Sequence, residues 1–336
     1  MKPVYNRASE RERILRDAVE RIWALPPQSE SLLVYDEPGL IYEMLADKGH
    51  VAYHWNRWSR GLVTGRAVPD EFEASAAVLR IPKSKDALSY AGHILASRLK
   101  AGSTLYLCGA NDEGIKSAVK PLGALFDHAV TLGTKARCRV ISAQRTSTSA
   151  EGHLEHWWRS SPMDILGQRR QWFRLPGVFA RGQLDPATQL LIENLPKWQS
   201  GARILDFACG TGVIAQACKN IDPNAMVTAI DADSLAVECT RRNVPSATTL
   251  CGDTWHGLPR KEFDLIVSNP PIHDGKSEDH GVLKQLIEHA PAYLRAAGRL
   301  IIVCQTRIGV GRLFSQTFKK PACLAETSQF QVWSSH

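Results

Sequence analysis

The feature that most constrains the fold is residues 203–219, where a short apolar strand runs into a glycine turn and then into a helical pattern. The turn contains Gly210 and Gly212, and the helical pattern begins at Val213. A strand, a glycine turn and a helix within about seventeen residues open a Rossmann-type unit. The sequence therefore predicts an open α/β sheet whose ligand site lies beyond the carboxyl ends of its strands.

Two classes of cofactor fit this turn. Gly210, Gly212 and Ala215 match the dinucleotide fingerprint G-x-G-x-x-G/A, which indicates a nicotinamide or flavin cofactor. Asp206, however, stands at the strand end just before the turn. A carboxylate there repels a pyrophosphate but attracts the cationic amino acid moiety of S-adenosylmethionine (SAM). The charge therefore favours SAM over NAD.

Two further strands also lead to acidic residues. The strand 226–230 is followed by Asp231, which is placed to accept hydrogen bonds from two ribose hydroxyls. The run 247–252 is followed by Asp253, which could face the adenine amine. Aspartate is common in turns, so each residue alone says little. Acids at successive strand ends together predict a cofactor site.

The apolar run 263–267 leads into a rigid polar turn at Asn269, Pro270 and Pro271. Proline fixes φ and pushes the preceding residue out of the α region, so Asn269 is expected to be nearly extended. Its amide oxygen and the Pro270 carbonyl would then be neighbouring acceptors that suit an NH2 group. The alternative is a proline-rich loop that only ends a strand.

These motifs resemble the class I SAM-dependent methyltransferases of the Asn-Pro-Pro group, which methylate exocyclic or amide nitrogens. Residues 269–275 and 175–181 are similar to the ribosomal RNA guanine-N2 methyltransferases, most closely those of the small subunit. The resemblance implies SAM as cofactor, the N2 amine of an rRNA guanine as target, and ribosomal RNA or the small ribosomal subunit as partner. Accepting both N–H bonds of the amine at Asn269 and Pro270 would aim its lone pair at the methyl group.

The resemblance also implies roles for individual residues. Ile272 stands where the family has an aromatic that stacks on the target base, and Ala208 replaces the first glycine of the usual turn. The expected catalytic residues are Asn269, Pro270, Pro271 and Ile272, the cofactor-binding residues are Asp206, Ala208, Gly210, Gly212, Asp231, Asp253 and Asn269, and the substrate-binding residues are Phe179, Arg181, Ile272 and His273.

The length of 336 residues predicts two α/β domains, 1–160 and 161–336. Residues 99–107 align without gaps on residues 294–302, which suggests tandem Rossmann-like methyltransferase domains. The first half lacks both the glycine turn and Asn-Pro-Pro, so we expect a degenerate domain that serves RNA binding or stability. It is predicted to be a parallel unit with a helix ending at Ala124. The second is expected to be catalytic, with a seven-stranded sheet that ends in an antiparallel hairpin.

Charge and composition fit an intracellular protein that binds nucleic acid. The net charge is +7, and residues 51–145 hold 14 Lys and Arg against 7 Asp and Glu, which suits a polyanion such as RNA. The eight cysteines form no C-x-x-C pair, and no run approaches the ~18 apolar residues of a membrane span. The sequence predicts a cytoplasmic monomer with reduced thiols, no metal and no membrane association.

Two other functions remain open at this stage. Asn-Pro-Pro chemistry equally permits methylation of a protein glutamine amide. A catalytically decayed RNA-binding factor for ribosome assembly is the second alternative, because Ile272 lacks the π-stacking of the family's aromatic.

Overall fold

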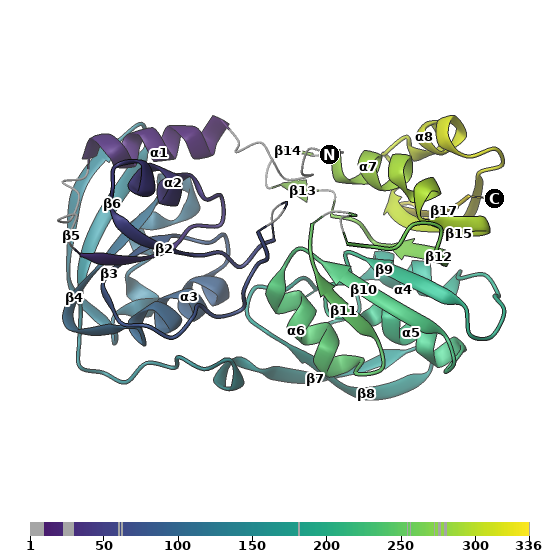
Figure 1. The fold of residues 1–336 in the computed structure, drawn as a ribbon, viewed down its shortest axis with the longest axis horizontal. Coiled ribbons are helices and arrows are strands. Elements are labelled where there is room, and N and C mark those ends of the chain that lie inside the picture. Colours follow the sequence, from purple (N-terminus) through teal and green to yellow (C-terminus); the bar gives the residue numbers. More distant parts are fainter. Residues whose placement is uncertain are drawn as a thin grey trace. The chain divides into compact units, whose positions relative to one another are not determined.

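The computed structural model describes residues 10–22, 30–59, 61, 63–180, 182–253, 255, 257–271, 273–274, 277–278 and 281–335. The chain divides into two compact units, which appear in Figure 1. The N-terminal unit comprises Arg7–Arg57 and Arg66–Trp158. The C-terminal unit comprises Arg159–His336 together with Trp58–Gly65, a segment from the first half of the sequence.

Within the described residues, the N-terminal unit is built on a six-stranded sheet in the order β2-β1-β3-β4-β6-β5. The strands β2, β1, β3 and β4 are parallel, whereas β6 and β5 are antiparallel. Its elements are α1 (Glu10–Ile22), β1 (Ser31–Tyr35), α2 (Leu40–Asp47), β2 (Val51–Trp55), β3 (Ala74–Arg80), α3 (Lys85–Ala96), β4 (Leu99–Ala110), three 3-10 turns (Asn111–Glu113, Ile115–Ser117, Lys120–Leu122), β5 (Phe126–Lys135), β6 (Cys138–Arg145) and a further 3-10 turn (Leu154–Trp157).

The C-terminal unit begins with a hairpin of β7 (Arg159–Ile165) and β8 (Gln168–Arg174). Its main sheet has seven strands among the residues described, as predicted. Their order is β11-β10-β9-β12-β15-β17-β16. The other elements are α4 (Pro186–Glu193), β9 (Arg203–Phe207), α5 (Val213–Ile221), β10 (Met226–Asp231), α6 (Ser234–Asn243), β11 (Thr248–Cys251), β12 (Phe263–Ser268), β13 (His273–Asp274), β14 (Ser277–Glu278), α7 (Gly281–His289), a 3-10 turn (Ala290–Ala292), β15 (Leu294–Gln305), α8 (Val310–Thr317), β16 (Ala322–Glu326) and β17 (Phe330–Ser334).

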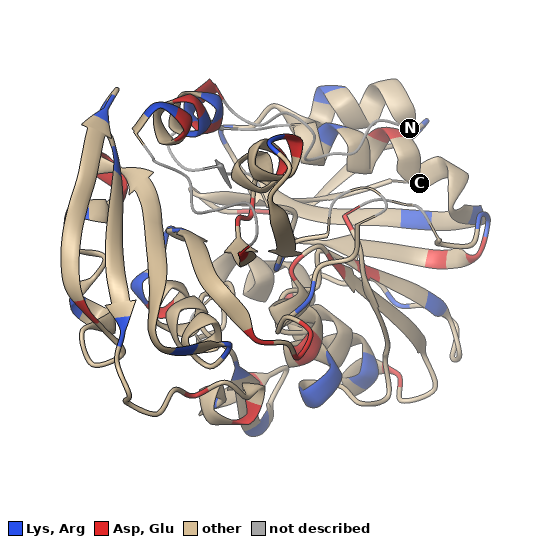
Figure 2. Cartoon of the chain, turned by 60° about the vertical axis from the view of Figure 1, so that its left-hand side comes forward, with Lys and Arg blue, Asp and Glu red and all other residues tan. Residues whose placement is uncertain are grey.

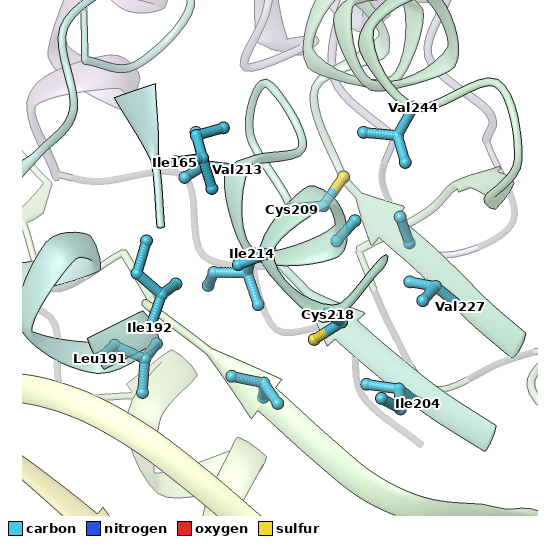
Figure 3. Packing of buried hydrophobic residues seen from close by; sticks show 14 of the residues in the cluster. Ile165, Leu191, Ile192, Ile204, Cys209, Val213, Ile214, Cys218, Val227 and Val244 are labelled. Atoms are coloured by element: carbon cyan, nitrogen blue, oxygen red, sulfur yellow. The ribbon is translucent and has the colours of Figure 1, made fainter. Parts of the chain in front are cut away.

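Alternating side chains of this sheet enter two separate cores. Ile204 packs with Leu191, Ile192 and residues of α5 in the cluster drawn in Figure 3. Its neighbour Leu205 points to the opposite face and packs in a second cluster with residues of α7 and α8. Both faces are apolar, as expected for parallel strands covered by helices on each side. The two cores hold the strand ends, and therefore the predicted site residues, at one edge of the sheet.

The structure corrects two details of the first half. The predicted helix ending at Ala124 is a series of short 3-10 turns, because Gly114 adopts φ +92° and Pro121 interrupts the backbone donors. The predicted all-parallel arrangement is wrong for the last two strands, because β5 and β6 form an antiparallel hairpin. The hairpin of β7 and β8 was not predicted, since its largely polar strands lack clear alternation.

The two units share one topology. The order β2-β1-β3-β4-β6-β5 matches β10-β9-β12-β15-β17-β16 strand for strand, with the same parallel and antiparallel pairings. The aligned repeat lies in β4 and β15, and each of these strands shifts register by the same amount against its parallel neighbour. Among the described residues, β11 and α6 have no counterpart in the N-terminal unit. This agreement supports tandem methyltransferase-like domains.

The pairing registers identify what stands at the site positions in the N-terminal copy. Counting along equivalent strand pairs, Val34 occupies the place of Asp206 and Asn56 that of Asp231. Arg80 occupies the place of Asn269. In this copy, an apolar and an amide side chain therefore stand where the C-terminal unit has the two acids.

An ion-pair cluster fills the corresponding strand end. Arg80 is buried and donates to Glu12 at 2.9 Å, to Glu113 at 2.8 Å and to the carbonyl oxygen of Ile81 at 2.7 Å. Burial by itself lowers the pKa of Arg80, but the two carboxylates outweigh burial and raise it. Glu12 comes from α1, whose charges of both signs are visible in Figure 2. These ion pairs attach α1 to the end of β3. The position equivalent to Asn269 in the N-terminal unit is therefore filled by protein side chains.

Candidate active site

The glycine turn after β9 has the conformation that its residue types allow. Gly210 and Gly212 adopt φ +56° and +89°. Ala208 also lies in the left-handed region, at φ +61°, so the alanine keeps the glycine-type backbone at a cost of roughly 1 kcal/mol. A Cβ on Gly210 would meet no atom within 4 Å, whereas one on Gly212 would lie 3.0 Å from Thr240. Gly212 is needed for packing, and Gly210 leaves open space for a ligand.

Asp206 is fully buried beneath this turn. Its Oδ2 accepts a hydrogen bond from the Ala215 amide at 2.9 Å, whereas its buried Oδ1 has no partner among the described residues. Burial, and to a smaller degree the nearby Asp231 carboxylate, raises the pKa of Asp206 to about 8. A buried carboxyl oxygen without a donor could accept a hydrogen bond from a cationic ligand group, and the role of Asp206 toward the ammonium of SAM stays a prediction.

Asp231 at the end of β10 is held by two backbone donors. Its Oδ2 accepts from the Gly210 amide at 2.8 Å and its Oδ1 accepts from the Asp233 amide at 2.9 Å. The bond to Gly210 ties the carboxylate to the glycine turn. The carboxylate is therefore fixed at the end of β10, and its predicted role is to accept hydrogen bonds from two ribose hydroxyls.

Asp253 follows β11 and is buried, with 5% of its surface exposed. The amide of Gly61 donates to its Oδ1 at 3.1 Å and to its Oδ2 at 3.2 Å. The sequence carries no signal for this contact, because Gly61 lies 192 positions away from Asp253. The three predicted acids therefore follow or end β9, β10 and β11, which are neighbours in the sheet.

Asn269 follows β12 and has a fixed orientation. Its amide nitrogen Nδ2 donates to Oδ2 of Asp185 at 3.0 Å and to Oγ1 of Thr188 at 2.9 Å. Asp185 caps the N-terminus of α4, and Thr188 lies in the first turn of the same helix. These bonds use both amide hydrogens, so the carbonyl oxygen Oδ1 is the atom presented to a ligand. The sequence marks the helix cap, because Asp185 is followed by Pro186, but it does not indicate that Asp185 contacts Asn269.

The turn around Asn269 is anchored on both sides. Ser268 is buried, and its hydroxyl donates to the Phe207 carbonyl at the end of β9 at 2.6 Å. Pro270 is buried and Pro271 is exposed. The rigid turn predicted from the prolines is therefore attached by this hydrogen bond to β9, the strand that carries Asp206.

The predicted substrate-binding residues are described only in part. Phe179 is 64% exposed, which leaves its ring accessible to a partner. Arg181 and Ile272 lie outside the described residues, and His273 is described only as backbone in the short strand β13. Their roles stay predictions.

The described part of the chain contains no cluster of three or more His, Cys, Asp or Glu side chains placed to hold a metal ion. A cavity of about 470 Å³ lies between the β7–β8 hairpin and α4, and none of the three acids or Asn269 lines it. None of the helices in the described ranges combines the length and the apolar character of a membrane span.

Family models match both units. Residues 49–161 match the N-terminal methyltransferase small domain, and residues 170–334 match the methyltransferase small domain. The chain is 32% identical to ribosomal RNA small subunit methyltransferase C of Stutzerimonas stutzeri, over 79% of this chain and 80% of the relative. The chain belongs to the ribosomal RNA small subunit methyltransferase C family. The enzyme of the same name from Pseudoalteromonas atlantica is 29% identical over 91% of this chain and 94% of its own.

A solved structure agrees with this membership of the methyltransferase C family. The 16S rRNA N2 G1207 methyltransferase (RsmC) of T. thermophilus, in complex with AdoMet and guanosine, has a TM-score of 0.83. It is 23% identical, and the match covers 96% of this chain and 91% of that chain. The likeness shows that the whole two-unit fold is shared. The predictions of a SAM-dependent methyltransferase and of tandem methyltransferase domains are confirmed.

Proposed function

We propose that this protein methylates the exocyclic N2 amine of a guanine in 16S rRNA, with SAM as the methyl donor. The observation that carries the proposal is the orientation of Asn269, whose amide hydrogens both bond to α4 so that Oδ1 is presented as an acceptor. Family membership and the names of the relatives support the rRNA target.

The residues of the chain divide the work of binding. Asp206, with its unpartnered Oδ1, would hold the ammonium group, Asp231 the ribose hydroxyls and Asp253 the adenine amine. SAM, when bound, supplies an electrophilic methyl group on a positively charged sulfur. The glycine turn, open above Gly210, gives the ligand room to approach the backbone.

Asn269 and Pro270 would orient the nucleophile. The amine of guanine is a weak nucleophile because its lone pair is delocalised into the ring. Donation of both N–H bonds to Oδ1 of Asn269 and to the Pro270 carbonyl would turn the lone pair toward the methyl group. No strong general base is needed before attack. The C–N bond would form as the C–S bond breaks to leave a neutral thioether, and the methylated amine would then lose its acidic proton to water.

The proposal extends to the setting in which the enzyme works. We infer that the C-terminal unit is catalytic and that the N-terminal unit serves RNA binding or stability, since its counterpart of the Asn269 position is occupied by the Arg80 cluster. The partner would be 16S rRNA, either free or in the small subunit, and the enzyme would act as a cytoplasmic monomer. Phe179, Arg181, Ile272 and His273 are proposed to contact the target nucleotide.

The test is the Asn269→Ala variant. We expect loss of methyl transfer to small-subunit rRNA, with the affinity for SAM largely retained because Asn269 acts on the amine. Asn194→Ala at the end of α4, where the side chain donates to the Leu190 carbonyl of the same helix, is the matched control and should keep full activity. Turnover by Asn269→Ala at the wild-type rate would contradict the mechanism.

The same assay separates the alternatives. Methyl label appearing in protein glutamine rather than in N2-methylguanine would indicate the amide methyltransferase. Absence of SAM binding in the wild-type chain would indicate a decayed assembly factor.

A further inference from the structure

The segment Trp58–Gly65 belongs to the first half of the sequence but to the C-terminal unit in its contacts. It begins shortly after β2, the counterpart of β10. In the C-terminal unit β10 is followed by α6 and β11, which the described N-terminal unit lacks. In the N-terminal copy, the segment Trp58–Gly65 follows β2 instead. The residues that flank the segment are joined by a hydrogen bond, in which the Arg66 amide donates to the Asn56 carbonyl at 2.8 Å.

The start of the segment pairs with the chain that follows β10. Trp58 forms an antiparallel bridge with Asp233. The Ser59 amide donates to the Ala232 carbonyl at 2.7 Å. Ala232 and Asp233 come directly after Asp231, the residue proposed to bind the ribose hydroxyls. The segment therefore lies beside the end of β10.

A buried hydroxyl fastens the segment to the end of β11. Ser59 is 1% exposed, and its Oγ lies 3.1 Å from Sγ of Cys251. The same oxygen accepts a hydrogen bond from the Gly65 amide at 2.9 Å, which closes the segment on itself. Ser59 therefore holds both the shape of the segment and its attachment to β11.

The middle of the segment contacts Asp253, the residue proposed to bind the adenine amine. The Gly61 amide is shared between the two carboxylate oxygens of Asp253, at 3.1 and 3.2 Å. A donor shared between the two oxygens fixes the direction in which the carboxylate group points.

We propose that Trp58–Gly65 is part of the SAM site and that Ser59 is a positioning residue for adenine recognition. Through Gly61 the segment sets the direction of the Asp253 carboxylate toward the 6-amino group of the base. This inference rests on the proposed SAM-dependent function. It means that a piece of the degenerate copy completes the cofactor site of the catalytic one.

The test compares two nucleosides that differ at the base. 5′-Methylthioadenosine carries the 6-amino group, whereas 5′-methylthioinosine carries an oxygen there. Their dissociation constants are measured by calorimetry on the full-length wild-type, Ser59→Ala and Thr64→Ala proteins. We expect Ser59→Ala to weaken methylthioadenosine binding by roughly five- to tenfold, the loss of about one hydrogen bond, and to leave methylthioinosine binding unchanged.

Thr64→Ala is the matched control, since Thr64 lies in the same segment but is exposed. It should keep the wild-type preference for the adenine nucleoside. A Ser59→Ala protein with that same preference would overturn the proposal, as would an equal loss for both nucleosides, which indicates only a damaged fold.

A measurement on the wild-type protein covers the case in which Ser59→Ala does not fold. Amide hydrogen exchange is followed with saturating methylthioadenosine and with saturating methylthioinosine. We expect slower exchange in Trp58–Gly65 with the adenine nucleoside only. Equal exchange with the two nucleosides contradicts the proposal.

Failure of this inference differs from failure of the proposed function. If the segment has no part in adenine recognition, the nucleoside preference is unaltered by Ser59→Ala while rRNA methylation persists. If the proposed function is wrong, methylation of rRNA is absent in the wild-type protein itself.

Discussion

At the scale of single residues, Asp206 is an acid whose folded environment disfavours its charge. Burial raises its pKa to about 8, above the value of 3.8 that an unperturbed aspartate has. Between these two pH values the folded state keeps a proton that the unfolded state releases. The contribution of Asp206 to stability therefore falls as pH rises from about 4 to 8.

We predict that Asp206→Asn removes this decline. Without ligand, the variant should melt above the wild type at pH 8, and the difference should shrink as the pH falls toward 4 and below, where the unfolded wild-type chain also takes up the proton. Calorimetric melting temperatures at several pH values test this. Asp70→Asn, at a highly exposed side chain, is the control and should follow the wild type throughout. A melting difference independent of pH would contradict the prediction.

At the scale of elements, the N-terminus of α4 and the end of β12 form one unit. Asp185 caps the helix through the Thr188 amide at 2.9 Å, and the same carboxylate accepts from Asn269. The hydroxyl of Thr188 is the second acceptor for Asn269, so a helix cap also sets the rotation of the proposed catalytic amide.

We predict that Thr188→Val lowers kcat about tenfold, because loss of one hydrogen bond of roughly 1–1.5 kcal/mol releases the Asn269 amide from its orientation. The affinity for SAM should be unchanged, since Thr188 orients the amide rather than the cofactor. Gln189→Ala, at an exposed position of the same helix, is the control. Single-turnover kinetics and calorimetry measure the two quantities. An unchanged kcat, or a loss of SAM affinity alone, would exclude a positioning role.

At the scale of the whole molecule, one topology appears twice with different occupants at the strand ends. The C-terminal copy has Asp206, Asp231 and Asn269, and the N-terminal copy has Val34, Asn56 and Arg80. The N-terminal positions hold no carboxylate for an ammonium or a ribose. Arg80 is already satisfied by Glu12 and Glu113.

We predict a single SAM site per chain despite the two methyltransferase-like sheets. Calorimetric titration with S-adenosylhomocysteine should give a stoichiometry of about one, as expected for a single-site linkage. Asp231→Ala should abolish this binding, and Asn56→Ala, at the equivalent position of the other copy, should preserve it. A stoichiometry of two, or loss of binding only in Asn56→Ala, would contradict the assignment.

Local patterns explain how much of this protein is predictable from sequence. The strand, glycine turn and helix of residues 203–219 and the turn at Asn269 each depend on neighbours within a few positions. Backbone freedom at Gly210 and Gly212, and the rigidity of two prolines, are properties of those residues themselves. The order of strands in the C-terminal sheet follows from the same class of fold.

Other features depend on pairs that are distant in the chain. Neither the antiparallel hairpin of β5 and β6 nor that of β7 and β8 has a turn or a periodic pattern that marks it clearly. The bond from Asn269 to Asp185 spans 84 positions and that from Gly61 to Asp253 spans 192. The sequence around a polar side chain or a loop amide does not indicate which distant residue it will bond to.

The sequence by itself determined the class of fold and the positions of the strand-end acids, because each follows from local stereochemistry and charge. The methyl-donor chemistry followed from the resemblance of these motifs to the Asn-Pro-Pro methyltransferases. The tertiary structure alone decided which way Asn269 presents its amide, what occupies the site positions of the first copy, and which loop reaches Asp253. These depend on the packing of strands and helices, which brings groups from distant parts of the chain within hydrogen-bond distance.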